Sequence, residues 1–165
     1  MQAEQLPGVE VTAMETSIQQ WTGVDKAVNL VLLFDFLYHV ERADRQALFQ
    51  QLFTQCLAPN GVVIIITACY GPTCGYMLLR ERLGKPAKVY YEELEKEMLA
   101  AGFSVVYTQD MRGSNDFSNP SEDLVKFVQM DTYYVATEQQ VRSAIADIFG
   151  SIKSNFHKKL AVFKK

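Results

Sequence analysis

The sequence has 165 residues, of which 48% are hydrophobic and 21% are charged, so we expect one globular domain over residues 1–165. The net charge of −3 argues against nucleic-acid binding, which usually requires a clustered basic face. The apolar stretches are too short to span a membrane, and the N-terminus lacks the basic and apolar regions of a signal peptide, so we expect a cytoplasmic protein without membrane contact.

The first half of the chain predicts two buried strands on either side of a helix. The apolar run that opens Val28–Val40 is typical of a strand covered on both faces. Apolar residues at helical spacing follow, up to Leu57, and the turn residues Ala58–Gly61 end that helix. Val62–Cys69 is rich in β-branched residues and predicts the second strand.

The second half predicts further helices and two short strands. A loop and a short helix occupy residues 69–86, and Tyr91–Ala101 reads as a helix closed by a glycine. Phe103–Tyr107 predicts a third strand, Gly113–Pro120 a polar loop, and Leu160–Phe163 a final strand.

Two helix starts are marked by capping residues between these last two strands. Ser121 is placed to cap one helix, and Thr137 with Gln140 forms a capping box for the next. Behind the capping box lies the apolar stripe of an amphipathic helix: Val141, Ala144, Ile145, Ile148 and Phe149. Strands alternating with helices predict an α/β fold with a mostly parallel sheet and flanking helices.

The cysteines and histidines show no spacing typical of a metal site or a nucleophile. Cys56 and Cys69 lie in apolar patterns and read as buried small hydrophobic residues, whereas Cys74 stands in a Gly/Pro loop. Neither His39 nor His157 has a Cys/His/Asp arrangement around it in the sequence. We therefore predict no metal ligand from the sequence.

Several segments resemble one enzyme family. DKAVNLVLLFDFLYHV (25–40) and RQALFQQLFTQCLAPNGVVIIITA (45–68) resemble the fourth strand, following helix and fifth strand of class I S-adenosylmethionine-dependent methyltransferases. The sequence is similar in more detail to histamine N-methyltransferases, in METS (14–17), LYHV (37–40), GYMLLRERLG (75–84) and EDLVKFVQMDTYYVAT (122–137). The resemblance runs in order from about Val11 to the end of the chain.

The resemblance implies a partial Rossmann-like methyltransferase sheet, and methyl transfer from S-adenosylmethionine to a small amine. In that family the donor lies in a GxGxG turn and against an acidic residue, both carried by the N-terminal half with the first three strands. No two of the nine glycines here are spaced as GxG. A glycine-rich turn lets backbone N–H groups approach a ligand closely. We therefore expect impaired transfer and no binding of the donor by this chain alone.

The resemblance also implies site residues. Ser17 and Phe34 match positions beside the donor's adenine, and the positions matching the family's substrate pocket are Asp35, Tyr38, His39, Tyr76 and Tyr134. A carboxylate at Asp35 would suit a protonated amine, although it would hold the amine in its unreactive form. Asp35 equally reads as an ordinary strand-end aspartate, and the aromatic residues as core or rim side chains. No catalytic residue is predicted.

Two functions remain open: an amine methyltransferase, and a non-catalytic interaction or small-amine-binding module derived from the same fold. The strand Val28–Phe34 would lack the neighbour it has in the family, and an apolar edge of this kind is a template for pairing with another chain. We therefore predict a homodimer. Alternatively, the N-terminal segment, residues 1–22, adds a strand over this edge, since Val9–Ala13 alternates suitably.

Overall fold

The computed structural model of the chain describes residue 15 and residues 27–69, 75–116, 121–150 and 153–165. Strands and helices follow one another along these residues. The helical elements are η1 (Leu37–His39, 3₁₀), α1 (Arg42–Gln51), η2 (Leu52–Cys56, π-helical), α2 (Gly75–Arg82), α3 (Tyr91–Ala100), α4 (Glu122–Asp131) and α5 (Glu138–Phe149). The predicted fold class, α/β with flanking helices, is confirmed.

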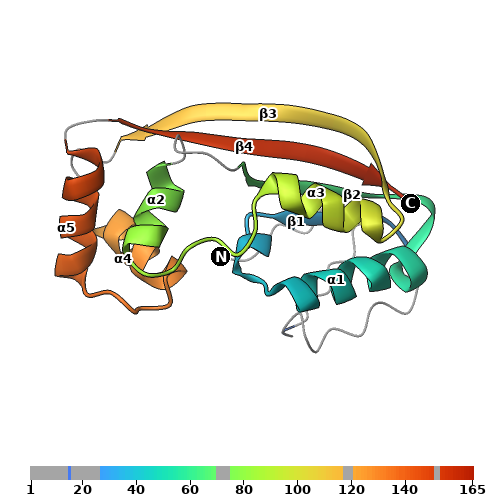
Figure 1. The fold of residues 1–165 in the computed structure, drawn as a ribbon, viewed down its shortest axis with the longest axis horizontal. Coiled ribbons are helices and arrows are strands. Elements are labelled where there is room, and N and C mark those ends of the chain that lie inside the picture. The colour runs from blue at the N-terminus through green and yellow to red at the C-terminus, as the bar shows by residue number, and fades with distance from the viewer. Residues whose placement is uncertain (1–14, 16–26, 70–74, 117–120, 151–152) are drawn as a thin grey trace, which may run out of the picture.

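Four strands form a mixed sheet in the described residues, in the order β1-β2-β4-β3 (Figure 1). β1 (Val28–Phe34) pairs in parallel with β2 (Leu57–Ala68). β4 (Lys153–Lys164) lies between β2 and β3 (Ser104–Asp116) and is antiparallel to both. β1, β2 and β3 therefore run in one direction, as expected for a mostly parallel sheet. β4 lies between β2 and β3 and runs in the opposite direction, so only the β1–β2 pairing is parallel.

The helices bury two separate hydrophobic clusters. α1 and α3 pack against the sheet, where Phe49, Leu94 and Phe163 are fully buried. α2, α4 and α5 gather at the other end of the molecule, around Val141 and Ile145 (Figure 1). The long strands β3 and β4 extend across both regions, so the two clusters share one framework.

Local sequence signals are confirmed at the helix starts. The Ser121 hydroxyl accepts a hydrogen bond from the Leu124 N–H at 3.1 Å. Thr137 and Gln140 form the complete capping box, and the buried face of α5 includes Val141 and Ile145 from the predicted stripe. Such caps are predictable because they satisfy N–H groups within the same helical turn.

The predicted limits of the last two strands were wrong. β3 continues to Asp116, through half of the segment Gly113–Pro120 that was assigned to a loop, and β4 begins at Lys153 rather than Leu160. The prediction relied on apolar runs, whereas the additional pairs, such as Arg112 with His157, are largely polar. These residues are held by the ladder between two strands and not by burial.

The turn predicted at Ala58–Gly61 is present, but as an irregularity within β2. Val28 pairs with Leu57 and Leu30 with Val62, so the intervening residues leave the ladder. Cys56 and Cys69 are buried thiols, as predicted, and Cys74 lies outside the described residues. In the residues that are described, no helix combines the length and apolar character needed to cross a bilayer.

Candidate functional site

Asp35 follows β1 at its carboxyl end, where ligands of open α/β sheets bind. The Asp35 backbone N–H donates to the Ile66 carbonyl at 2.9 Å, which continues the β1–β2 ladder. Asp35 does so with a positive φ of 53°. Its Oδ2 accepts a hydrogen bond from Lys158 Nζ at 2.6 Å, whereas its Oδ1 is buried and has no hydrogen-bond partner among the described residues. One oxygen of this carboxylate is thus neutralised by a lysine, and the other has unused accepting capacity.

Asp131, the last residue of α4, lies at the centre of a polar cluster between η1, α2 and α4. The Tyr76 hydroxyl donates to Asp131 Oδ2 at 2.6 Å, and Arg80 Nη1 forms an ion pair with the same oxygen and bonds the Asp131 carbonyl at 3.1 Å. His39 Nε2 lies 3.1 Å from Asp131 Oδ1. With side-chain exposures of 2% for Arg80 and 9% for Asp131, the charges are almost fully withdrawn from water.

The surroundings of His39 favour its neutral form. Burial lowers the pKa of its imidazole, and the positive charge of Arg80 lowers it further, against the opposing effect of Asp131. Arg80 Nη2 lies 3.4 Å from Nδ1, and an arginine can only donate, so Nδ1 accepts and Nε2 carries the proton that it donates to Asp131. Both ring nitrogens are therefore engaged, and His39 acts as a bridge and not as a general base.

Tyr76 is held as a hydrogen-bond donor. Burial raises the pKa of its hydroxyl, and the hydrogen bond to Asp131 and the charge of Asp131 raise it further. The phenol consequently keeps its proton at physiological pH, and its oxygen points into the cluster at 2.6 Å from Asp131 Oδ2. Tyr76 thus contributes position and an aromatic wall but no titrating group.

Aromatic rings surround the cluster. The Arg80 guanidinium lies 5.1 Å from the centre of the Tyr38 ring, and the Tyr38 and His39 rings are 4.4 Å apart. Tyr133 packs edge-on against His39 at 5.6 Å. Both Tyr133 and Tyr134 have positive φ, 57° and 54°, which is costly for bulky residues and is often found where function fixes the backbone.

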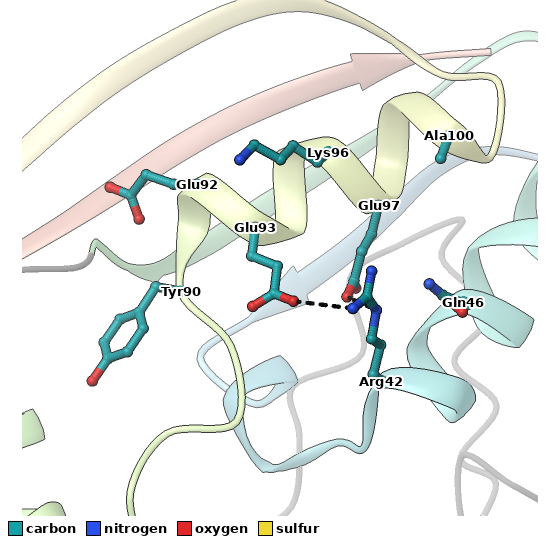
Figure 2. A pocket seen from close by; sticks show the side chains of 8 residues that line it. All are labelled: Arg42, Gln46, Tyr90, Glu92, Glu93, Lys96, Glu97 and Ala100. Carbon is teal, nitrogen blue, oxygen red and sulfur yellow. Dashed lines mark ion pairs between the residues drawn. The ribbon is translucent and has the colours of Figure 1, made fainter.

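A different hollow lies between α1 and α3 (Figure 2). It has a volume of about 660 Å³, and its wall includes Arg42, which lies 3.8 Å from Glu93 and 3.6 Å from Glu97. The fully buried Arg45 forms a bidentate pair with Glu97 of the wall, at 2.9 and 2.8 Å. None of the predicted site residues lines this hollow, and Arg42, Glu93 and Glu97 in its wall pair with one another, so we assign it a structural role.

The structure brings three of the predicted substrate residues together, namely Tyr38, His39 and Tyr76. Tyr134 is exposed and, in the described part of the chain, shares none of these contacts; its neighbour Tyr133 does. Of the remaining predicted positions, Phe34 is half exposed at the end of β1, and Asp35 lies beside Lys158. Ser17 lies outside the described residues.

The sequence reasoning missed Arg80 and Asp131, which connect the other residues. Arg80 stands one helical turn after Tyr76 in α2, so the two share a face. Asp131 ends α4, where the helix dipole disfavours a carboxylate. An acidic residue at that position is a signal that a cation compensates it.

Solved structures provide the comparison for this fold. No protein-family model matches the sequence, and no curated protein matches it significantly. A protein from Bacillus halodurans assigned as a methyltransferase is similar at a TM-score of 0.66 and 10% identity, over 92% of this chain and 70% of that one. An S-adenosylmethionine-dependent methyltransferase from Mesorhizobium loti is similar at 0.53 and 12% identity, over 96% and 71%. The chain therefore shares the fold of these methyltransferase structures.

The fold alone does not determine the reaction. The [4+2]-cyclase SpnF is similar at a TM-score of 0.52 and 12% identity, over 91% of this chain. The chain covers 54% of the cyclase and about seven-tenths of the other two structures. Unrelated chemistries share this fold, so activity must be argued from side chains.

The described residues fit S-adenosylmethionine only in part. At the end of β1, Phe34 offers a half-exposed ring, and Asp35 offers a buried oxygen that bonds none of the described residues. The amino-acid end of the donor requires a close backbone cradle, and no GxG pair exists anywhere in the sequence. We therefore derive no reaction step through this cofactor.

Proposed function

We propose that this chain forms the acceptor side of an S-adenosylmethionine-dependent methyltransferase of the histamine N-methyltransferase type, and that it does not bind the donor by itself. The observation that carries the proposal is the assembly of Tyr38, His39 and Tyr76 around Arg80 and Asp131 on a methyltransferase fold. Three positions that the family resemblance assigns to the substrate pocket thereby meet in space.

The proposed acceptor is a small amine anchored by Asp35. Its Oδ1 is buried and has no hydrogen-bond partner in the part of the chain that the structure describes, and a donor supplied by a ligand would remove the cost of that burial. Lys158 holds the other oxygen at 2.6 Å, so an incoming ammonium competes with an ammonium that is already present. The neutral form of an amine suffers less from this competition, and the neutral form is the one that attacks a sulfonium methyl group.

Calorimetric titration with histamine tests the anchor. We expect weak binding by the wild-type chain, loss of binding in Asp35→Asn, and tighter binding in Lys158→Met, which removes the competing charge. Lys165→Met, whose ammonium binds the Leu57 carbonyl instead, is the matched control and should leave binding unchanged. Equal affinities in the Asp35→Asn and wild-type proteins would refute Asp35 as the anchor.

A separate experiment tests the donor. Titration of the chain with S-adenosylmethionine should show no binding at millimolar donor, and a radiolabel assay with histamine should show no enzyme-dependent methyl transfer. Micromolar binding of the donor, or transfer that co-elutes with the chain on a sizing column, would overturn this part of the proposal and leave the amine anchor untouched.

The second candidate, a dimeric interaction module, is favoured by the exposed face of β1. Among the described strands β1 pairs only with β2, and it carries three exposed apolar side chains at alternating positions: Leu30, Leu32 and Phe34. Leu32 is 52% exposed. We propose that a second copy of the chain pairs with this edge, because an unpaired apolar edge strand is a template for association.

Light scattering at low micromolar concentration tests the dimer. The wild-type chain should have twice the monomer mass, and Leu32→Lys should reduce it to the monomer. Val106→Lys, which places the same charge at an exposed position of the opposite edge strand β3, is the control and should remain dimeric. A wild-type monomer would refute the dimer and favour coverage of β1 by residues 1–22.

A further inference from the structure

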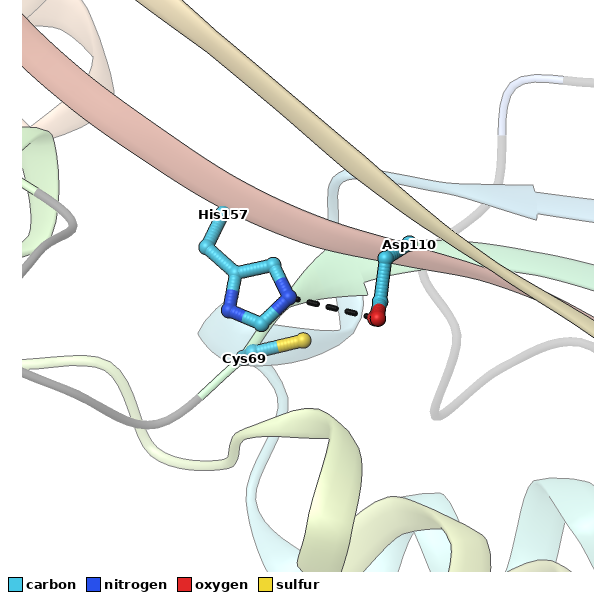
Figure 3. Close-up of side chains that lie close together, drawn as sticks. All are labelled: Cys69, Asp110 and His157. Atoms are coloured by element: carbon cyan, nitrogen blue, oxygen red, sulfur yellow. Dashed lines mark hydrogen bonds and ion pairs between the residues drawn. The ribbon is translucent and has the colours of Figure 1, made fainter.

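Three potential metal ligands lie together on one face of the sheet: Cys69, directly after β2, Asp110 in β3 and His157 in β4 (Figure 3). Ala68 pairs with Lys158, and the next residue, Cys69, donates its N–H to the His157 carbonyl at 3.0 Å, so Cys69 and His157 are cross-strand neighbours. Asp110 pairs with Lys159, two residues after His157. Side chains two residues apart on a strand share a face, so Cys69, His157 and Asp110 converge.

The ligand atoms are spaced for a small divalent cation. The Cys69 thiol, one His157 ring nitrogen and one Asp110 carboxylate oxygen all lie within 4.8 Å of one another. His157 Nε2 and Asp110 Oδ1 are 3.1 Å apart. Bond lengths of about 2.0–2.3 Å to tetrahedral zinc place two ligand atoms roughly 3.4–3.6 Å apart. Shifts of an ångström or less would therefore bring the three atoms around one ion.

The chemistry of the set favours zinc over harder cations. A thiolate and an imidazole are soft and borderline ligands, which Mg²⁺ and Ca²⁺ do not select. Cys69 is buried, whereas the Asp110 side chain is half exposed, so the site has a closed side and a side open to water. Three protein ligands with one open position are the pattern of a zinc ion that also holds a water molecule.

One neighbouring charge opposes a cation here. Lys159 Nζ lies 3.5 Å from Asp110 Oδ1 and therefore competes with a metal ion for that oxygen. The same ammonium lies 4.8 Å from the centre of the Tyr91 ring, which gives it an alternative partner when Asp110 turns to a metal. The lysine thus weakens the site without blocking it.

We propose that Cys69, Asp110 and His157 bind one Zn²⁺ ion, with a water molecule in the fourth position. Binding releases the thiol proton of Cys69 to solvent, and His157 binds through the lone pair of Nε2 with its proton on Nδ1. The ion would tie the end of β2 to β4 and β3. This site is separate in its residues from the Asp131 cluster, so it does not depend on the proposed methyltransferase function.

Metal titration of the reduced full chain tests the site. Zn²⁺ should bind with one-site stoichiometry, and Asp110→Asn and His157→Gln should each weaken binding by at least about tenfold. Lys159→Met should tighten it. With Co²⁺ as the probe, the wild-type chain should show a thiolate-to-cobalt charge-transfer band that Cys69→Ser abolishes and Asp110→Asn retains.

Cys56→Ser and Cys74→Ser are the cysteine controls and should keep both the affinity and the band. Asp110 and His157 are not fully buried, so their variants keep the test decisive even where Cys69→Ser fails to fold. The proposal is overturned when the wild-type chain does not bind Zn²⁺ at high micromolar concentration. Wild-type affinity in both the Asp110 and His157 variants, or loss of the cobalt band in Cys74→Ser, would also overturn it.

Discussion

Replacing Asp131 with asparagine should destabilise the protein strongly, because it leaves the Arg80 charge buried without a counterion. Arg80 is 2% exposed, and its Nη1 pairs with Asp131. Breaking a buried ion pair by removing one partner costs roughly 3–5 kcal/mol. Asparagine retains one oxygen that can still accept from Tyr76, so we expect the lower end, about 3 kcal/mol.

The assay is urea denaturation followed by circular dichroism, with thermal melting beside it. For a chain of this size, 1 kcal/mol corresponds to about 2–4 °C, so the melting temperature should fall by roughly 6–12 °C. Asp147→Asn is the matched control, since Asp147 pairs with Arg82 at 3.5 Å but is 56% exposed. An exposed pair contributes at most about 1 kcal/mol.

The double variant Arg80→Met/Asp131→Leu separates charge burial from packing. It removes both charges and should recover part of the stability lost in Asp131→Asn, because no unpaired charge remains. If Asp131→Asn and Asp147→Asn lose the same small amount of stability, the Asp131 cluster is not a buried ion pair, and the reasoning is refuted.

Two further predictions concern stability. Ile145→Asp should prevent stable folding, because Ile145 is fully buried in the α5 cluster and an unpaired buried carboxylate costs roughly several kcal/mol. A soluble variant with an unchanged melting temperature would contradict this prediction. His39 has a lowered pKa in the folded state, so its contribution is complete above about pH 6.5, the ordinary histidine pKa, and is lost as pH falls below that value. The decrease in melting temperature from pH 7.5 to pH 5.5 should therefore be larger for the wild-type chain than for His39→Gln. Equal decreases in the two proteins would exclude His39 as the cause.

Sequence patterns predicted the features that depend on neighbouring residues. The capping box at Thr137 and the stripe of α5 are set within single helical turns, and both are present. The apolar runs located the strands β1 and β2, but the expected burial on both faces was wrong for β1, where Leu30, Leu32 and Phe34 are exposed. The polar halves of β3 and β4 were not recognisable, because their pairing depends on each other and not on their own composition.

The polar contacts of the candidate site depend on long-range packing. Arg80 and Asp131 are 51 residues apart, and each alone reads as a solvated surface charge. Cys69, Asp110 and His157 likewise meet only once three strands pair, so no local spacing could reveal them. Asp35 was placed correctly at the end of β1, but its pairing with Lys158 was not predicted, because the two residues are 123 positions apart and meet only when the strands pair.

The two hydrophobic clusters give the chain two cooperative units joined by the β3–β4 ribbon. The cluster under α1 and α3 includes the central strands, whereas the α4–α5 cluster is smaller and reaches the first mainly through Tyr76. Local opening follows such boundaries, because contacts within a unit outnumber those between units. We expect α4 and α5 to open at a lower free energy than β2, so amide hydrogens of Val128 and Ile145 should exchange sooner than that of Ile65. An opening of this kind separates Asp131 from His39 and Tyr76 while the sheet remains intact, so access to the aromatic wall can change without global unfolding.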